Sequence, residues 1–435
     1  MEEGGLSAGA LDHRRADASP RPRRPMRFLV DRVWPLWLHP AFRRLVVLNF
    51  LLGLANSFVL PFMSMFGTLE AGMSLFRFGA FMTTNAVSGI VIATVLAHWS
   101  DGLVSRRALL LLGSLAGAVG YLGYAYLRSF VPLVLVGSLA LGVASVTFSQ
   151  LFAYARELLA ESELDPSQGA YYINVFRMFM ALSWTVGPAL ASWVMLRFSY
   201  RGLFLCAAGN LLLFAAAVWA GVPATVPAAR ATRAAAGGDG RPLWKLLARP
   251  DLLAHFVAFV LIAAASSIAM MNLPLLILKT LHGTETNVGI AYSVAPVFEL
   301  PFMLYFGWMA TRRAPARVIR IGMLISTAYY TCLVLVSEPR QVYYCQALAA
   351  AATSIVQGVA ITYFQGHLPR HPGTATNLYS TAQRIGSTAG YFLFVGLAWR
   401  FGHRSVFEAC ALFAMAGLAL MMVPVRLPAD EVTCV

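Results

Sequence analysis

The chain has 435 residues, of which 59% are hydrophobic and only 12% are charged, and its mean hydropathy is +0.67. Soluble globular proteins are usually about one-quarter charged, so this composition excludes an ordinary soluble protein and indicates side chains buried in lipid. The net charge of +14 would suggest nucleic acid as the partner of a soluble protein. Here the basic residues flank apolar runs, so we expect a lipid bilayer and no nucleic acid as partner.

In chain order, the sequence begins with a basic segment that has no periodic apolar pattern. We interpret residues 1–40 as a disordered cytoplasmic tail without a cleavable signal peptide. Twelve apolar runs of membrane-spanning length follow, and each predicts a transmembrane helix. The predicted spans are Leu45–Phe66, Phe78–His98, Ala108–Leu127, Pro132–Ala153, Tyr171–Leu196, Gly202–Val222, Leu252–Leu278, Val288–Ala310, Val318–Val336, Val342–Phe364, Thr376–Trp399 and Ser405–Val423.

The distribution of Lys and Arg predicts the orientation of these spans. With both termini on the cytoplasmic side, most of the basic residues fall in the inner segments, which is the usual bias of a bacterial inner-membrane protein. The stretch at 223–250 is small, basic and flexible, as expected of a cytoplasmic linker. We therefore predict six-helix bundles at 41–222 and 251–424, followed by a cytoplasmic tail at 425–435.

The two predicted bundles share local sequence motifs. An Arg-Phe-x-x-Arg-x-x-Phe motif occurs at residues 197–204 and again at residues 400–407, before the last span of each half. His39-Pro40 before the first span matches Arg249-Pro250 before the seventh. Two parallel six-helix repeats resemble the major facilitator fold, in which the substrate site lies between the halves. We predict an all-α membrane protein of twelve transmembrane helices in two six-helix pseudo-repeats, expected to be a monomer.

Three ionisable residues fall near the middle of predicted spans, where a charge is costly unless it is paired or hydrated. They are Arg177 in the fifth span, Glu299 in the eighth and Arg384 in the eleventh. The fifth and eighth spans of the major facilitator fold face each other, so we hypothesise that Glu299 carries a proton and that Arg177 is its counter-charge. A structural salt bridge is the alternative, and the role of Arg384 stays open.

Amide and aromatic residues extend a polar face around these charges at helical spacing. Planar amides and carboxylates form paired hydrogen bonds with hydroxyl groups, and aromatic faces cover sugar C–H surfaces, so the pattern favours a polyhydroxylated ligand. Interhelical polar packing is the alternative for individual amides. The predicted substrate-binding residues are Asn49, Asn56, Asn85, Asn174, Arg177, Trp184, Asn272, Tyr292, Glu299, Gln357, Asn377 and Arg384.

Two further stretches resemble known motifs. The loop after the second span, with Asp101, Arg106 and Arg107, resembles the cytoplasmic gate motif of major facilitator proteins. The stretch ending in Arg156 and Glu157 resembles the end of the fourth span in the bacterial sugar efflux transporter family. Residues 298–301, 363–365, 368–369 and 373–376 resemble other parts of the same family. We assign a gating role to these five charged residues; for the arginines, a topology signal is the alternative.

The family resemblance implies proton-linked export of small sugars or glycosides. Its expected partners are therefore a sugar and protons. No nucleophilic elbow, phosphate loop or metal-ligand cluster occurs, so we expect neither an enzyme nor a cofactor. Two alternatives stay open: a multidrug or small-solute exporter, and a non-transporting membrane sensor built on the same fold.

Overall fold

The computed structural model describes residues 40–100, 104–161, 169–224, 247–368 and 372–424. The predicted N-terminal tail up to residue 39, most of the predicted linker and the C-terminal tail lie outside these residues. Pro40, predicted as the last tail residue, is the first residue of a helix, and the predicted bundle boundaries stay predictions. The chain divides into compact units at 1–45 and 46–435, and the arrangement described below is that of the second unit.

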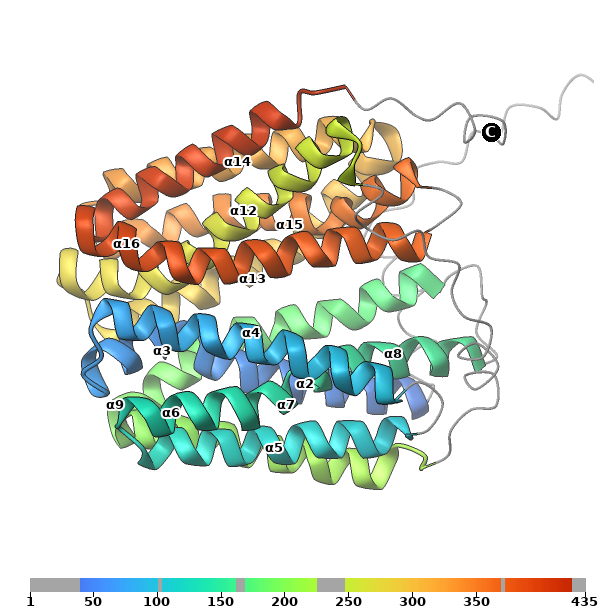
Figure 1. The fold of residues 1–435 in the computed structure, drawn as a ribbon, viewed down its shortest axis with the longest axis vertical. Coiled ribbons are helices and arrows are strands. Elements are labelled where there is room, and N and C mark those ends of the chain that lie inside the picture. The colour runs from blue at the N-terminus through green and yellow to red at the C-terminus, as the bar shows by residue number, and fades with distance from the viewer. Residues whose placement is uncertain (1–39, 101–103, 162–168, 225–246, 369–371, 425–435) are drawn as a thin grey trace, which may run out of the picture. The chain divides into compact units, whose positions relative to one another are not determined.

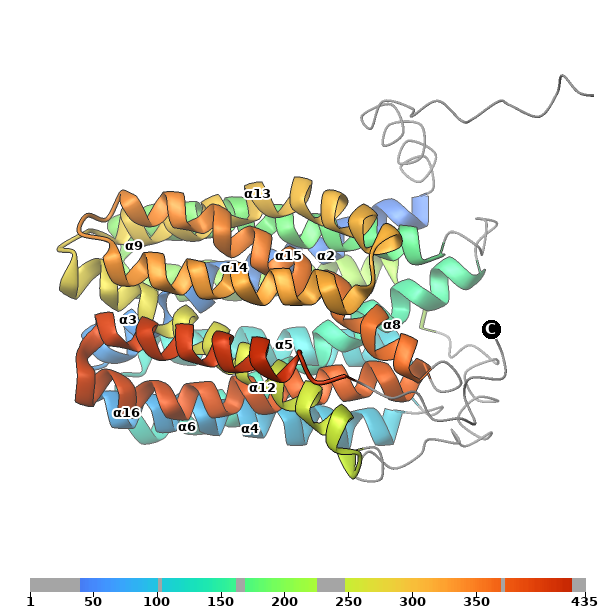
Figure 2. The same cartoon turned by 90° about the horizontal axis from the view of Figure 1, so that it is seen from above.

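Every regular element of the described chain is helical, as the apolar runs predict. Figures 1 and 2 show the helices lying side by side with their long axes roughly parallel. The first half contains α2 (Pro40–Val59) with short turns to Glu70, α4 (Leu75–Ser100), α5 (Arg106–Tyr126), α6 (Phe130–Val136), α7 (Gly142–Ala144), α8 (Val146–Glu161) and α9 (Gly169–Gly221). The second half contains α12 (Pro250–Leu275), α13 (Glu285–Arg312), α14 (Pro315–Leu335), α15 (Gln341–His367) and α16 (Pro372–Leu420).

Nine segments of the described chain are long and apolar enough to cross a membrane. Two of them, at 178–221 and 374–420, contain a kink and hold two predicted spans each. One further span falls on α13. The twelve predicted spans thus coincide with helices to within a few residues.

The kinks of α9 and α16 occupy the same place in the repeated sequence motif. Ser199 (φ 54°) and Gly402 (φ 79°) are each the third residue of Arg-Phe-x-x-Arg, and both have a positive φ. Figure 1 shows the chain of α16 reversing direction at this kink. The motif therefore marks a tight turn between the last two spans of each half.

A second pair of turns supports the same repeat. The first span ends in a π-helical turn at Phe66–Glu70, and the seventh ends in one at Leu276–Thr280. Each is followed by a left-handed residue, Gly72 (φ 61°) or His282 (φ 53°), before the next helix begins. These matched turns support the predicted repeat of the two halves. We refer to the end of the bundle that carries these four left-handed residues as the turn end.

The two halves contact each other near the turn end. The rings of Phe78 in α4 and Phe394 in α16 meet edge to face, with centroids 6.3 Å apart. The backbone N–H of Ala189 in α9 donates to Oγ of Ser293 in α13 at 3.1 Å. Both contacts join a helix of the first half to a helix of the second.

Gly402→Ala is expected to lower the free energy of unfolding by about 1–3 kcal/mol, because its φ and ψ (79°, 171°) lie in a region essentially restricted to glycine. A Cβ at this position would meet no atom within 4 Å, so the cost is purely conformational. Gly396→Ala is the matched control, since it has the same open surroundings in a helical backbone. Thermal unfolding of both variants in detergent checks the prediction; equal melting temperatures would contradict it.

Candidate functional site

The second half contains a cavity of about 440 Å³, a size typical of small-molecule sites. Its walls come from α12 to α16, with Leu60 of the first half at one edge. No lining residue in the described part of the chain carries a formal charge. The polar lining residues are Ser266, Ser267, Tyr292, Ser326, Tyr329, Tyr330, Thr353, Gln357, Gln383, Ser387 and Tyr391.

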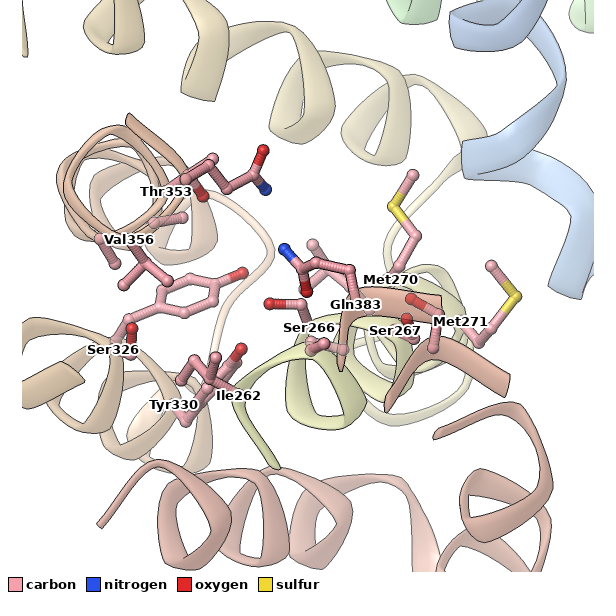
Figure 3. A pocket seen from close by; sticks show the side chains of 18 of the residues that line it. Ile262, Ser266, Ser267, Met270, Met271, Ser326, Tyr330, Thr353, Val356 and Gln383 are labelled. Atoms are coloured by element: carbon pink, nitrogen blue, oxygen red, sulfur yellow. The ribbon is translucent and has the colours of Figure 1, made fainter. Parts of the chain in front are cut away.

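Helical periodicity explains how the sequence gathers these side chains. Gln383, Ser387 and Tyr391 are spaced four residues apart, so they form one stripe along α16. Thr353 and Gln357 form the equivalent stripe on α15. Figure 3 shows Gln383 and other labelled polar side chains around one open space.

Hydrogen bonds within the protein position two of the side chains that line the cavity. The Tyr292 hydroxyl donates to the backbone oxygen of Met270 at 2.7 Å, which ties α13 to α12. Nε2 of Gln383 donates to the Tyr379 hydroxyl at 2.8 Å, one turn away on α16. A pocket of hydroxyls, amides and aromatic faces without charge suits an uncharged, hydroxylated solute.

A second hollow, of about 850 Å³, lies between α4 and α16; we refer to it as the α4–α16 groove. It is lined by Thr83, Ile90 and Thr94 on α4 and by Asn377, Ser380, Thr381, Arg384, Ile385, Thr388, Ala389 and Phe392 on α16. The α4–α16 groove and the 440 Å³ cavity share no lining residue, because consecutive residues of α16 point about 100° apart.

The structure distributes four predicted binding residues over these two hollows. Tyr292 and Gln357 line the cavity, whereas Asn377 and Arg384 line the α4–α16 groove. Sequence reasoning missed most of the cavity lining, including Gln383. The four-residue spacing of Gln383, Ser387 and Tyr391 was the available signal.

Two predicted amides of the first half form hydrogen bonds within that half. Asn49 is fully buried and its Nδ2 donates to the backbone oxygen of Phe176. Asn85 donates to the Tyr124 hydroxyl at 3.1 Å and accepts a bond from Ser138 at 3.4 Å. Such hydrogen bonds between helices are expected if these amides serve interhelical packing, which is the alternative to substrate binding.

Asn272 and Asn56 are also engaged with the framework. Nδ2 of the fully buried Asn272 donates to the backbone oxygen of His403 at 2.6 Å, and its Oδ1 lies 2.8 Å from Nδ1 of the same residue. These two bonds tie α12 to the kink of α16. Asn56 donates to the oxygen of Leu52 within its own helix at 3.2 Å. Substrate contacts by all four amides stay predictions.

The predicted ion pair is only partly described. Arg177 and Asn174 belong to α9, but their side chains lie outside the described residues, so pairing of Arg177 with Glu299 stays a prediction. Glu299 is half-buried on α13, and its backbone oxygen accepts a 3.2 Å bond from Oγ of Ser354 on α15. Glu299 and the half-buried Trp184 line neither the cavity nor the α4–α16 groove.

The structure brings two predicted gating residues together at the end opposite the turn end. Nη2 of Arg106 on α5 lies 2.7 Å from Oε1 of Glu157 on α8, and Arg106 also donates to Gln150. The guanidinium of Arg107 lies 5.5 Å from the ring centre of Trp219.

The remaining gate residues are described less fully. Arg156 is exposed on α8, and Asp101 lies outside the described residues. Opening and closing of a gate by these five residues stays a prediction.

Comparison with known proteins decides the family. The sequence profile of the Major Facilitator Superfamily matches residues 45–265 and again residues 255–433. A putative sugar efflux transporter of Deinococcus radiodurans is 32% identical over 389 residues, which cover 87% of this chain and 96% of that protein. The chain belongs to the sugar efflux transporter family of the Major Facilitator Superfamily. It is therefore a multi-pass membrane transporter and not an enzyme, and the family resemblance of the sequence is confirmed.

Other members of the family and other transporters are similar over the same length. Sugar efflux transporter A of Dickeya chrysanthemi is 31% identical over 386 residues, covering 88% of this chain and 94% of that protein. The crystal structure of the nucleoside transporter NupG aligns with a TM-score of 0.71 at 13% identity, covering 88% of this chain and 98% of that one. At such low identity, the likeness to NupG establishes the shared fold alone.

Proposed function

We propose that the protein exports small, uncharged sugars or glycosides from the cytoplasm across the bacterial inner membrane, with the cavity of α12–α16 as part of its substrate site. The observation that carries this proposal is the lining of that cavity, in which hydroxyls, two side-chain amides and tyrosine rings occur without a formal charge. Hydroxyl and amide groups exchange hydrogen bonds with sugar hydroxyls in both directions. The names of the relatives in Deinococcus radiodurans and Dickeya chrysanthemi agree with such a substrate.

Alternating access is the transport mechanism that we propose. The contacts between α4 and α16 and between α9 and α13 near the turn end support a state that is closed there. The Lys and Arg distribution predicts that the turn end faces outward. A second state, in which these contacts separate and the cavity opens outward, completes the cycle.

We further propose that a proton gradient drives export and that Glu299 is the proton carrier. Glu299 belongs to the interior of a predicted span, where a carboxyl group persists chiefly for a functional reason. Exchange of protons for sugar would use the inward proton gradient for outward transport.

The test is transport of radiolabelled lactose, glucose and a thioglycoside in inverted and right-side-out vesicles, with and without a pH gradient. Saturable movement that depends on the gradient is expected for at least one of them. No movement of any, with the protein folded and inserted, would contradict sugar export and favour another small solute.

Gln383→Ala is expected to raise the apparent KM for the transported sugar about 10-fold, because it removes one or two hydrogen bonds worth about 1 kcal/mol each. Gln341→Ala is the matched control, since Gln341 accepts a hydrogen bond from Ser337 at the start of α15 and lies outside the cavity lining. Initial rates over a range of sugar concentrations measure both variants. Equal KM values in the two variants would remove Gln383 from the substrate site.

A further inference from the structure

The α4–α16 groove contains a positive charge that has no partner among the residues that the structure describes. The side chain of Arg384 is exposed on α16, and it forms no hydrogen bond, ion pair or ring contact with any other described residue. Arg384 belongs to the interior of a predicted span, where an unpaired charge is costly unless water or an anion accompanies it. The described lining of the 440 Å³ cavity, on the neighbouring face of α16, is uncharged and does not include Arg384.

The other polar residues of the α4–α16 groove are uncharged and able to donate hydrogen bonds. Asn377, Thr381 and Thr388 lie on the same face of α16 as Arg384. Asn377 precedes Arg384 by seven residues, Thr381 precedes it by three, and Thr388 follows it by four, which are all helical spacings. Thr83 faces them from α4, and the hydroxyl oxygens of Thr83 and Thr388 are buried without a hydrogen-bond partner. No acidic residue lines the groove in the described part of the chain. This combination of one fixed cation with spare donors is that of an anion-binding site.

We propose that the α4–α16 groove binds the carboxylate of a singly charged sugar acid, with Arg384 as the residue that recognises it. The planar guanidinium forms two parallel hydrogen bonds with a carboxylate, and the threonine hydroxyls supply further donors. A sugar phosphate carries nearly two negative charges, and the described lining of the groove offers a single positive charge to balance them. The volume of about 850 Å³ accommodates a sugar-sized molecule.

This proposal extends the proposed sugar export to acidic sugars and rests on it for the transport measurement. Sugar acids would be recognised in the α4–α16 groove, whereas neutral sugars bind the cavity that Gln383 lines. Removing the charge of Arg384 should therefore weaken the transport of acidic sugars more than the transport of neutral sugars.

The experiment compares glucuronate, glucose and glucose 6-phosphate as substrates of reconstituted wild-type, Arg384→Gln and Arg384→Lys proteins. Arg384→Gln is expected to raise the apparent KM for glucuronate about 10- to 100-fold, because charged hydrogen bonds are lost, and to raise the ratio of this KM to the KM for glucose about 10-fold or more. Arg384→Lys keeps the positive charge but lacks the planar guanidinium, so its apparent KM for glucuronate should fall between those of the wild-type and Arg384→Gln proteins. Arg317→Gln is the matched control, because Arg317 is an exposed arginine at the start of α14 and lies outside both hollows.

A binding measurement keeps this inference separable from sugar transport. Glucuronate is expected to raise the melting temperature of the purified wild-type and Arg317→Gln proteins and to leave that of Arg384→Gln unchanged. Transport of glucose without any binding or transport of glucuronate would overturn the acidic-sugar proposal and leave sugar export standing. The proposal would also be overturned if glucuronate had no effect and glucose 6-phosphate or phosphatidylglycerol raised the melting temperature only when Arg384 is present. That result would identify the ligand as a phosphate or a lipid headgroup.

Discussion

Glu299→Gln is expected to reduce transport driven by a pH gradient to the level seen without a gradient, while sugar exchange without a gradient continues. Glutamine has nearly the shape of protonated glutamate but releases no proton, so the substitution removes coupling without removing the side chain. Glu299 is half-buried on α13, and its backbone oxygen accepts a hydrogen bond from Ser354 that the substitution leaves in place. Parallel measurements of gradient-driven accumulation and equilibrium exchange in proteoliposomes check this expectation.

Glu285→Gln is the matched control, since Glu285 lies in the first turn of the same helix near the turn end. It should retain gradient-driven accumulation. Wild-type coupling in Glu299→Gln would remove Glu299 from the proton pathway. The predicted pairing with Arg177 has a separate test: Arg177→Ala should be partly rescued by Glu299→Ala, and purely additive losses would argue against a contact.

The fold was predictable because hydropathy and helix length constrain a membrane chain strongly. In lipid, a spanning segment satisfies its backbone hydrogen bonds internally, so a long apolar run has few options besides a helix. The motif at 197–204 and 400–407 even located the turns between the last two spans of each half. The sequence did not reveal that Ser199 shares the left-handed backbone of Gly402, because serine has no preference for that conformation.

The candidate site was less predictable, because sequence indicates polarity but not what a side chain contacts. Asn272 and Gln357 are both amides within predicted spans, yet Asn272 is fully buried against His403 and Gln357 lines the cavity. Both placements satisfy a polar group within the membrane, so composition cannot distinguish them. Ser266 and Tyr330 were overlooked for the opposite reason: serine and tyrosine occur on many helix faces, and only the packing of α12 against its neighbours directs them into one cavity.

Gly289→Val is expected to abolish transport, with the protein folded and inserted, if the contact of α9 with α13 must form once in each cycle. A Cβ at position 289 would lie 2.7 Å from the backbone oxygen of Pro188 and 2.7 Å from Cβ of Ser192. The backbone of α9 cannot yield locally, so the two helices must separate near the turn end. A clash costing about 5.5 kcal/mol would shift an equilibrium from 99:1 in favour of the closed state to 99:1 against it.

Gly209→Val is the matched control, because a Cβ at that exposed position on α9 would meet no atom within 4 Å. The state of the turn end is measured with Ser293→Cys in a cysteine-free background, using a maleimide that does not cross membranes. Ser293 contacts Ala189 across the two halves, so the thiol should be labelled more slowly in the parent and in Gly209→Val than in Gly289→Val. Unchanged protection together with normal sugar flux in Gly289→Val would exclude a cycle in which α9 and α13 close and part. Labelling together with lost transport would link export to the separation of the two halves, independently of which solute is carried.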